Sequence, residues 1–129
     1  MTSASDAGFL PVRTGLLVVG HGSRRAEANA VLAGVADALR ARFDGPVRHA
    51  YLEIAAPDIA AGFAALVADG CERVVVHPCF LYPGNHTSSD IPRELSACAG
   101  DTPWTLTEPL NLDDRIVAVV LDRIAEVLP

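Results

Sequence analysis

Short apolar runs alternate with amphipathic stretches along the chain. Four runs rich in Val, Leu and Ile predict strands over residues 15–20, 47–53, 73–80 and 104–107. The first is continuous rather than alternating, which is typical of a strand buried on both faces. Four stretches have apolar residues at helical spacing and predict helices over residues 27–42, 57–70, about 90–100 and 111–128.

Residues at the helix ends support these limits. Pro57 is predicted at the first position of its helix, where its missing N–H costs nothing, and Gly70 ends that helix. Asn111 is predicted as the N-cap of the last helix, with Asp113 and Asp114 in the first turn. The apolar stripe of this last helix consists of Ile116, Val120, Ile124 and Val127.

Alternating strands and helices predict an α/β fold: one domain with a four-stranded parallel sheet flanked by helices, in three layers as in flavodoxin. A length of 129 residues suits one domain. Residues 1–14 are small and polar and predict a flexible N-terminal arm. With no signal-peptide core and no apolar run near the ~20 residues that span a bilayer, we expect a cytoplasmic protein.

Composition narrows the classes of partner and cofactor. The net charge is −6 and all ten basic residues are Arg, which argues against binding to nucleic acid or to an anionic membrane. An anionic substrate would therefore need a local arginine cluster. The three cysteines are odd in number and form no CxxC pair, so we expect no disulfide framework, zinc ribbon or iron–sulfur cluster.

Polar residues follow each predicted strand. His21 and Glu53 follow the first two strands, and His86 and Glu108 follow the third and fourth. Ligands of open parallel sheets bind beyond the carboxyl ends of the strands, so two imidazoles and a carboxylate converge there. These groups bind Fe, Co, Ni and Zn, and a site with few protein ligands leaves positions free for a second chelator. Glu108 is also compatible with a loop carboxylate without a role.

Each of these residues has a plainer interpretation. His21 fits a tight turn between two glycines, although those glycines also allow the close approach of a ligand. His86 fits a solvated turn, and Glu53 fits the exit of a strand into water. His49 and His77 lie within predicted strands, where a structural role is favoured. The sequence does not fit a serine hydrolase, because it has no G-x-S-x-G motif. It does not fit a phosphate-binding loop of the Walker type, because that motif requires a Lys and the chain has none.

Four motifs in order resemble the small-type sirohydrochlorin chelatases of the class II chelatase superfamily. They are Val-Val-Gly-His-Gly-Ser-Arg (18–24), Tyr-Leu-Glu (51–53), Phe-Leu-Tyr-Pro-Gly-Asn-His (80–86) and Asp-Ile-Pro (90–92). The resemblance runs from about Gly15 to the C-terminus and implies a chelatase-like domain over residues 15–129. Any one motif alone would be weak, but the ordered set is specific.

The resemblance implies ATP-independent insertion of Co²⁺, Fe²⁺ or Ni²⁺ into sirohydrochlorin, with the metal as a substrate and no organic cofactor. It makes His21 and His86 the metal-handling residues and Glu53 a ligand or a proton acceptor. It also implies a symmetric homodimer.

Sirohydrochlorin carries eight carboxylates, so forked hydrogen bonds from arginines suit its rim, and apolar side chains suit the face of its ring. The candidate substrate-binding residues are Ser23, Arg24, Arg25, Leu81, Tyr82 and Arg93. The arginines could equally be solvated residues at the start of a helix. Leu81 and Tyr82 could equally pack in the core. The same residues also suit a non-catalytic metal or tetrapyrrole carrier, or a relative recruited to other metal-assisted chemistry.

Overall fold

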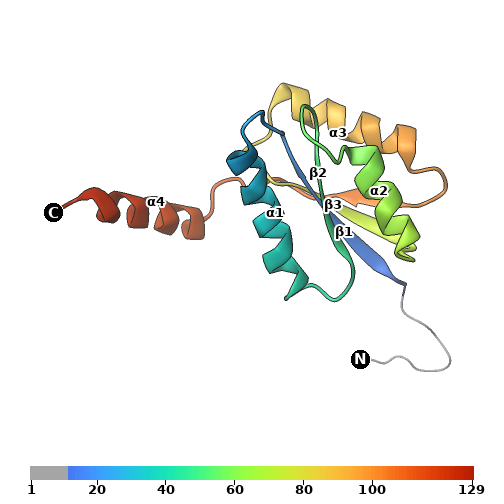
Figure 1. Cartoon of the computed structure of the whole chain (residues 1–129), viewed down its shortest axis with the longest axis horizontal. Coiled ribbons are helices and arrows are strands. Elements are labelled where there is room, and N and C mark those ends of the chain that lie inside the picture. The colour runs from blue at the N-terminus through green and yellow to red at the C-terminus, as the bar shows by residue number, and fades with distance from the viewer. Residues whose placement is uncertain (1–11) are drawn as a thin grey trace.

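The computed structural model describes residues 12–129, apart from the side chains of residues 85–88. Strands and helices alternate through this part of the chain (Figure 1). The strands are β1 (Thr14–Gly20), β2 (Val47–Tyr51), β3 (Arg73–Pro78) and β4 (Trp104–Leu106). The helices are α1 (Ala26–Arg40), α2 (Ile59–Ala68), α3 (Asn85–Cys98) and α4 (Asp114–Val127). The predicted order of elements is confirmed.

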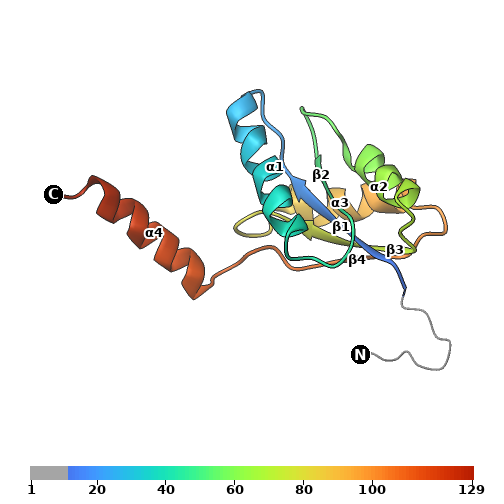
Figure 2. The same cartoon turned by 60° about the horizontal axis from the view of Figure 1, so that its bottom comes forward.

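The four strands form a parallel sheet in the order β2–β1–β3–β4. Figure 2 shows α1 on one side of this sheet and α2 and α3 on the other, which is the expected three-layer arrangement. Leu16 and Val18 of β1 pack on the α1 side, and Leu17 and Val19 pack on the α2–α3 side. Burial on both faces explains why the β1 segment is continuously apolar.

The larger core lies between the sheet and the pair α2 and α3. Its most buried helical side chains are Ile59, Phe63, Leu66, Ile91 and Leu95, each 1% exposed or less. Burying a side chain of this size contributes about 1.5–3 kcal/mol. This packing fixes α3 on the sheet, so the first turn of α3 stays at the edge where the strands end.

Three helix starts differ from the sequence-based expectation. Helix α2 begins at Ile59 rather than at Pro57, because the Asp58 carboxylate accepts a hydrogen bond from the backbone N–H of Ala61 (2.8 Å) and caps the helix. Helix α3 begins five residues earlier than Asp90, with Pro92 in its interior.

The N-cap of α4 is Asp113 and not Asn111. The Asp113 carboxylate accepts from the backbone N–H of Arg115 (2.9 Å) and also pairs with the Arg115 guanidinium. Asn111 has a φ of 57° and therefore belongs to the turn before the helix. The predicted stripe of α4 exists, but the helix projects away from the sheet and none of its residues is buried (Figures 1 and 2).

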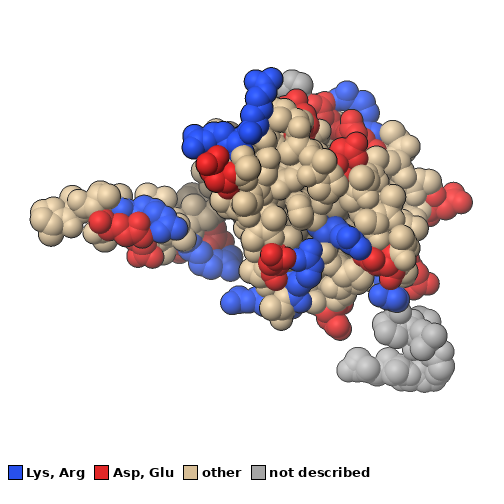
Figure 3. All heavy atoms as spheres, viewed as in Figure 1, with Lys and Arg blue, Asp and Glu red and all other residues tan. Residues whose placement is uncertain are grey.

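The chain enters β1 earlier than predicted. Thr14 already belongs to the strand, and the backbone N–H of Arg13 donates to the Glu72 carboxylate (3.0 Å). The predicted arm therefore falls mainly on residues 1–11, which lie outside the described part. Acidic and basic side chains intermingle on the face shown in Figure 3. No helix in the described residues has the length and apolar character to cross a membrane.

Candidate active site

The loops that leave β1 and β2 are joined at the carboxyl edge of the sheet. The backbone N–H of Leu52 donates to the carbonyl of Gly20 (2.8 Å), and that of Glu53 donates to the carbonyl of His21 (3.0 Å). The hydrogen-bond ladder between the strands thus continues past their ends. His21 and Glu53, two of the three predicted metal-handling residues, are therefore neighbours along one shared piece of backbone.

Gly22 allows this close approach. Its φ is +95°, a conformation that other residues rarely adopt. A Cβ atom at this position would lie 1.8 Å from the carbonyl oxygen of Glu53. The glycine after His21 is therefore required by the geometry of the loop.

Asn29 and Tyr51 hold the same loop from the other side. The Asn29 side chain accepts from the backbone N–H of Ser23 (2.9 Å) and donates to the Ser23 carbonyl (2.8 Å). The Tyr51 hydroxyl donates to the backbone carbonyl of Asn29 (2.6 Å). Sequence reasoning did not assign these two residues a role. The signal available was a tyrosine ending an apolar strand and an asparagine in the first turn of the helix before that strand.

An open groove of about 300 Å³ lies beside this loop, between α1 and the end of β3. The His21 side chain is exposed and lines the groove, and its ring centroid lies 4.8 Å from that of Phe80. Much of the remaining wall is apolar and includes Val31, Val35 and Cys79. A solvent-facing imidazole at the rim of an apolar groove is suited to meet a ligand that has an apolar face.

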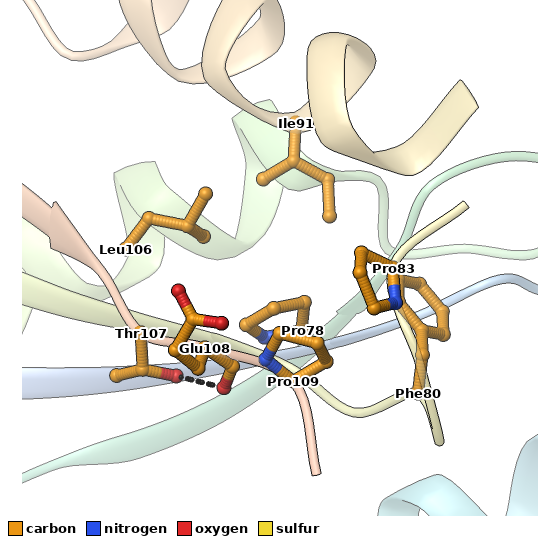
Figure 4. Close-up of a pocket in the computed structure, with 8 residues that line it drawn as sticks. All are labelled: Pro78, Phe80, Pro83, Ile91, Leu106, Thr107, Glu108 and Pro109. Atoms are coloured by element: carbon orange, nitrogen blue, oxygen red, sulfur yellow. Dashed lines mark hydrogen bonds between the residues drawn. The ribbon is translucent and has the colours of Figure 1, made fainter. Parts of the chain in front are cut away.

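A second cavity of about 260 Å³ lies where β3, β4 and α3 meet, and Phe80 lines both hollows. Figure 4 shows its lining, which consists of Pro78, Phe80, Pro83, Ile91, Leu106, Thr107, Glu108 and Pro109. Glu108 supplies an exposed carboxylate to this mainly apolar lining, and it accepts a long hydrogen bond from the Asn111 side chain (3.4 Å). The fourth strand therefore delivers an acid to a cavity wall rather than to an isolated loop.

Glu53 lines a different and wider hollow, of about 720 Å³, with Asp58 and Glu94. Among the side chains that the structure describes, no three His, Cys, Asp or Glu residues are grouped so that they could hold a metal ion. Residue 86 lies in the first turn of α3, and its side chain is outside the described part. A metal site shared by His21, His86 and Glu53 therefore stays a prediction.

The fold and this edge of the sheet can be compared with known proteins. The sequence model named CbiX matches residues 15–127. The chain belongs to the CbiX family. The sirohydrochlorin cobaltochelatase of Methanothermobacter thermautotrophicus is 34% identical over 130 residues, covering 87% of this chain and 91% of the relative. The chloroplastic sirohydrochlorin ferrochelatase of Arabidopsis thaliana is 36% identical over 118 residues, covering 88% of this chain and 52% of that relative.

A solved structure in the same group is the sirohydrochlorin chelatase SirB of Bacillus subtilis in complex with cobalt. It superimposes with a TM-score of 0.84 at 28% identity, covering 90% of this chain and 51% of SirB. This CbiX-family chain thus spans nearly the full length of the archaeal cobaltochelatase and about half the length of SirB and of the plant ferrochelatase.

The predicted substrate-binding residues of this CbiX-family chain are mostly exposed. Arg24 and Arg25 stand just before α1, where Arg25 pairs with Glu27 (3.3 Å). Arg93 pairs with Asp90 on α3. The loop after β3 exposes about half of Leu81 and more than half of Tyr82, so core packing does not account for them. Their contact with a substrate stays a prediction.

His49 and His77 have the structural surroundings expected of strand histidines. Both are half-buried, and they flank Val18 of β1 in the sheet register. The His49 ring packs edge-on against Tyr51, and the Nδ1 atom of His77 lies 2.8 Å from the Thr107 hydroxyl. Burial lowers the pKa of His77 below its usual value.

We expect the His77→Gln variant to lose part of the pH dependence of stability. The unfolded chain binds the His77 proton more readily than the folded chain. The contribution of neutral His77 to the free energy of unfolding is therefore complete above the unfolded pKa of about 6.5. It declines as the pH falls through that value toward the lowered folded pKa. Urea unfolding between pH 5 and 8 should show a shallower decline for the variant than for the unchanged chain. If the free energy of unfolding of the two proteins changed with pH in parallel, the structural role assigned to neutral His77 would be contradicted.

Proposed function

We propose that this chain is a sirohydrochlorin chelatase that inserts Co²⁺, Fe²⁺ or Ni²⁺ into the ring, in the biosynthesis of cobalamin or sirohaem. The observation that carries the proposal is the exposed imidazole of His21, held on a braced loop at the carboxyl edge of the sheet beside an apolar groove. Membership of the CbiX family and relatives named as cobaltochelatases and ferrochelatases support it.

The reaction exchanges two protons for one metal ion. The metal binds to the ring nitrogens, and the two pyrrole N–H protons must leave. His21 and His86 suit this exchange, because a neutral imidazole binds a divalent metal and can take up a proton when that bond breaks. Glu53 adds negative charge that favours both the metal ion and a protonated histidine. Proton acceptance of this kind contributes about 10²–10⁴ in rate.

The ring would lie over the loop after β3 with its carboxylates toward the start of α1. Leu81 and Tyr82 supply exposed apolar surface for a flat ring. Arg24 and Arg25 supply guanidinium groups for the rim, with Ser23 beside them, and Arg93 would extend this set from α3. Arg24 is exposed and forms no ion pair with another described side chain, so the substrate would not have to displace a protein partner.

We expect Arg24→Ala to raise KM for sirohydrochlorin about three- to tenfold and to leave kcat nearly unchanged. A rim contact binds the substrate and the transition state equally, so its loss weakens binding alone. Initial rates measured over a range of sirohydrochlorin concentrations separate the two constants. Arg42→Ala, in the turn just beyond the far end of α1, is the matched control and should change neither constant. A loss confined to kcat would contradict the rim role.

A carrier that binds without inserting would use the same residues, so the decisive experiment is catalytic. Protein, sirohydrochlorin and Co²⁺ are mixed anaerobically, and the change in the absorption spectrum is compared with that of a protein-free mixture. A chelatase accelerates the change, whereas a carrier shifts the spectrum of the ring or the metal without acceleration. Repeating the measurement with Fe²⁺ and Ni²⁺ ranks the three metals by their rate of insertion.

We also propose that the protein acts as a homodimer in the cytoplasm. Relatives such as SirB are about twice as long as this chain, so two copies would supply a comparable amount of protein. The three cysteines are free, which is typical of proteins in a reducing compartment.

A further inference from the structure

Helix α4 exposes an apolar face that the rest of the described chain leaves largely uncovered. The helix projects from the body in both views, and none of its residues is buried (Figures 1 and 2). At 3.6 residues per turn, one side of α4 is formed by Ile116, Val117, Val120, Leu121, Ile124 and Val127, which we call the α4 stripe. A soluble helix with such a stripe normally buries it against a partner.

Backbone contacts direct α4 away from its own sheet. The segment between β4 and α4 is bound to the loop after β3, with the N–H of Leu110 donating to the Phe80 carbonyl (2.9 Å) and that of Asn111 donating to the Leu81 carbonyl (2.6 Å). Asp113 then caps the helix and pairs with Arg115. The bonds of Leu110 and Asn111 fix the chain just before the helix, and burial of α4 against another molecule leaves them in place.

The sheet is covered unequally, and the uncovered part is also apolar. Within residues 12–129, α2 and α3 pack on one face of the sheet, and α1 is the one helix that packs on the other. The groove between α1 and β3 is lined by Ala28, Val31 and Val35 from α1 and by Cys79 and Phe80 from the other side. Val31 is 68% exposed and Val35 is 36% exposed, although both belong to the side of α1 that faces β3.

We propose that the α4 stripe of each chain packs into the α1 groove of a second copy. In this structure each chain presents an uncovered stripe and an uncovered groove, and a twofold axis would let two copies form the same contact twice. The lengths agree, since 14 residues of α4 and 15 of α1 give helices of about 21 and 22 Å. This specifies the interface of the proposed homodimer.

The exchanged helix would border the candidate active site. His21 and Val31 line the same groove, so a helix seated against Val31 lies close to the imidazole. The second copy would then supply apolar side chains to the wall of the site, and each groove would be complete only in the dimer.

The first measurement is the mass in solution, by light scattering on the full chain. The chain of 13.5 kDa should form a dimer of twice that mass. The stripe variant Val120→Glu/Ile124→Glu and the groove variant Val31→Glu/Val35→Glu should each be monomeric. The matched control Ala118→Glu/Ala125→Glu adds the same charge on the other side of α4 and should stay dimeric. Circular dichroism checks that each variant keeps its helices.

Mixing the two monomeric variants tests the exchange itself. The groove of the stripe variant and the stripe of the groove variant are both intact, so one of the two contacts can form and a mixed dimer should appear. A monomeric unchanged chain, a dimeric stripe variant, or a mixture that stays monomeric would each overturn the proposal. None of these readouts uses metal insertion, so failure here is distinct from failure of the proposed chelatase activity.

Discussion

Replacing His21 with alanine is expected to slow metal insertion at least tenfold. The exposed imidazole stands at the rim of the groove, and the proposed reaction uses it both to hold the metal and to accept a proton. His86→Ala should act in the same direction, and the double variant should retain little more than the protein-free rate. The measurement is the initial rate of the spectral change with Co²⁺ and sirohydrochlorin.

The control for this experiment is His49→Gln, because His49 is a half-buried histidine in the middle of β2 and not at the end where the strands deliver the candidate site. It should keep near-normal rates. Since His21 is exposed, its removal should leave the unfolding transition in place. Full activity in the double variant would remove the proposed mechanism, whatever the behaviour of the single variants.

Gly22→Ala is expected to lower both stability and activity. Its Cβ atom would overlap the Glu53 carbonyl oxygen at 1.8 Å, and alanine would be strained at a φ of +95°. We expect the free energy of unfolding to fall by at least about 2 kcal/mol. Because relief of the overlap must move His21 relative to Glu53, the rate of metal insertion should also fall by about tenfold or more.

Gly34→Ala is the matched control for that substitution. Gly34 lies within α1, and a Cβ atom there would meet nothing within 4 Å. Alanine is the better helix former, so this variant should gain about 0.5–1 kcal/mol. Urea unfolding followed by circular dichroism measures both changes. Equal stability of the two alanine variants would show that the close approach at Gly22 is not a constraint.

The sequence carried enough information for the fold because the core pattern is local. The continuous apolar run of β1 requires burial on both faces, and strands alternating with helices leave few arrangements other than a parallel sheet. The helix starts were less predictable. The Pro-Gly-Asn sequence before His86 favoured a loop, with the helix starting around Asp90 to Pro92, yet α3 begins at Asn85 and contains Pro92 in its interior.

The candidate site was only partly predictable for a similar reason. The positions of His21 and Glu53 follow from where their strands end. The braces from Asn29 and Tyr51 and the separate hollows beside His21 and Glu53 depend on how helices pack across the sheet, which no local pattern records. The apolar stripe of α4 predicted a helix with one apolar face, but none of its residues is buried in this structure, because an amphipathic pattern does not say which surface receives that face.

The backbone bonds that join the exits of β1 and β2 have a thermodynamic consequence for metal capture. His21 cannot shift along its loop without disturbing Glu53, because the carbonyl of His21 accepts the N–H of Glu53. In the proposed reaction, the main chain of His21 is therefore ordered before the ion arrives, and binding of the ion would restrict mainly the rotation of the side chain. The smaller entropy loss favours binding, while a fixed backbone limits how far the imidazole can follow the ion into the ring.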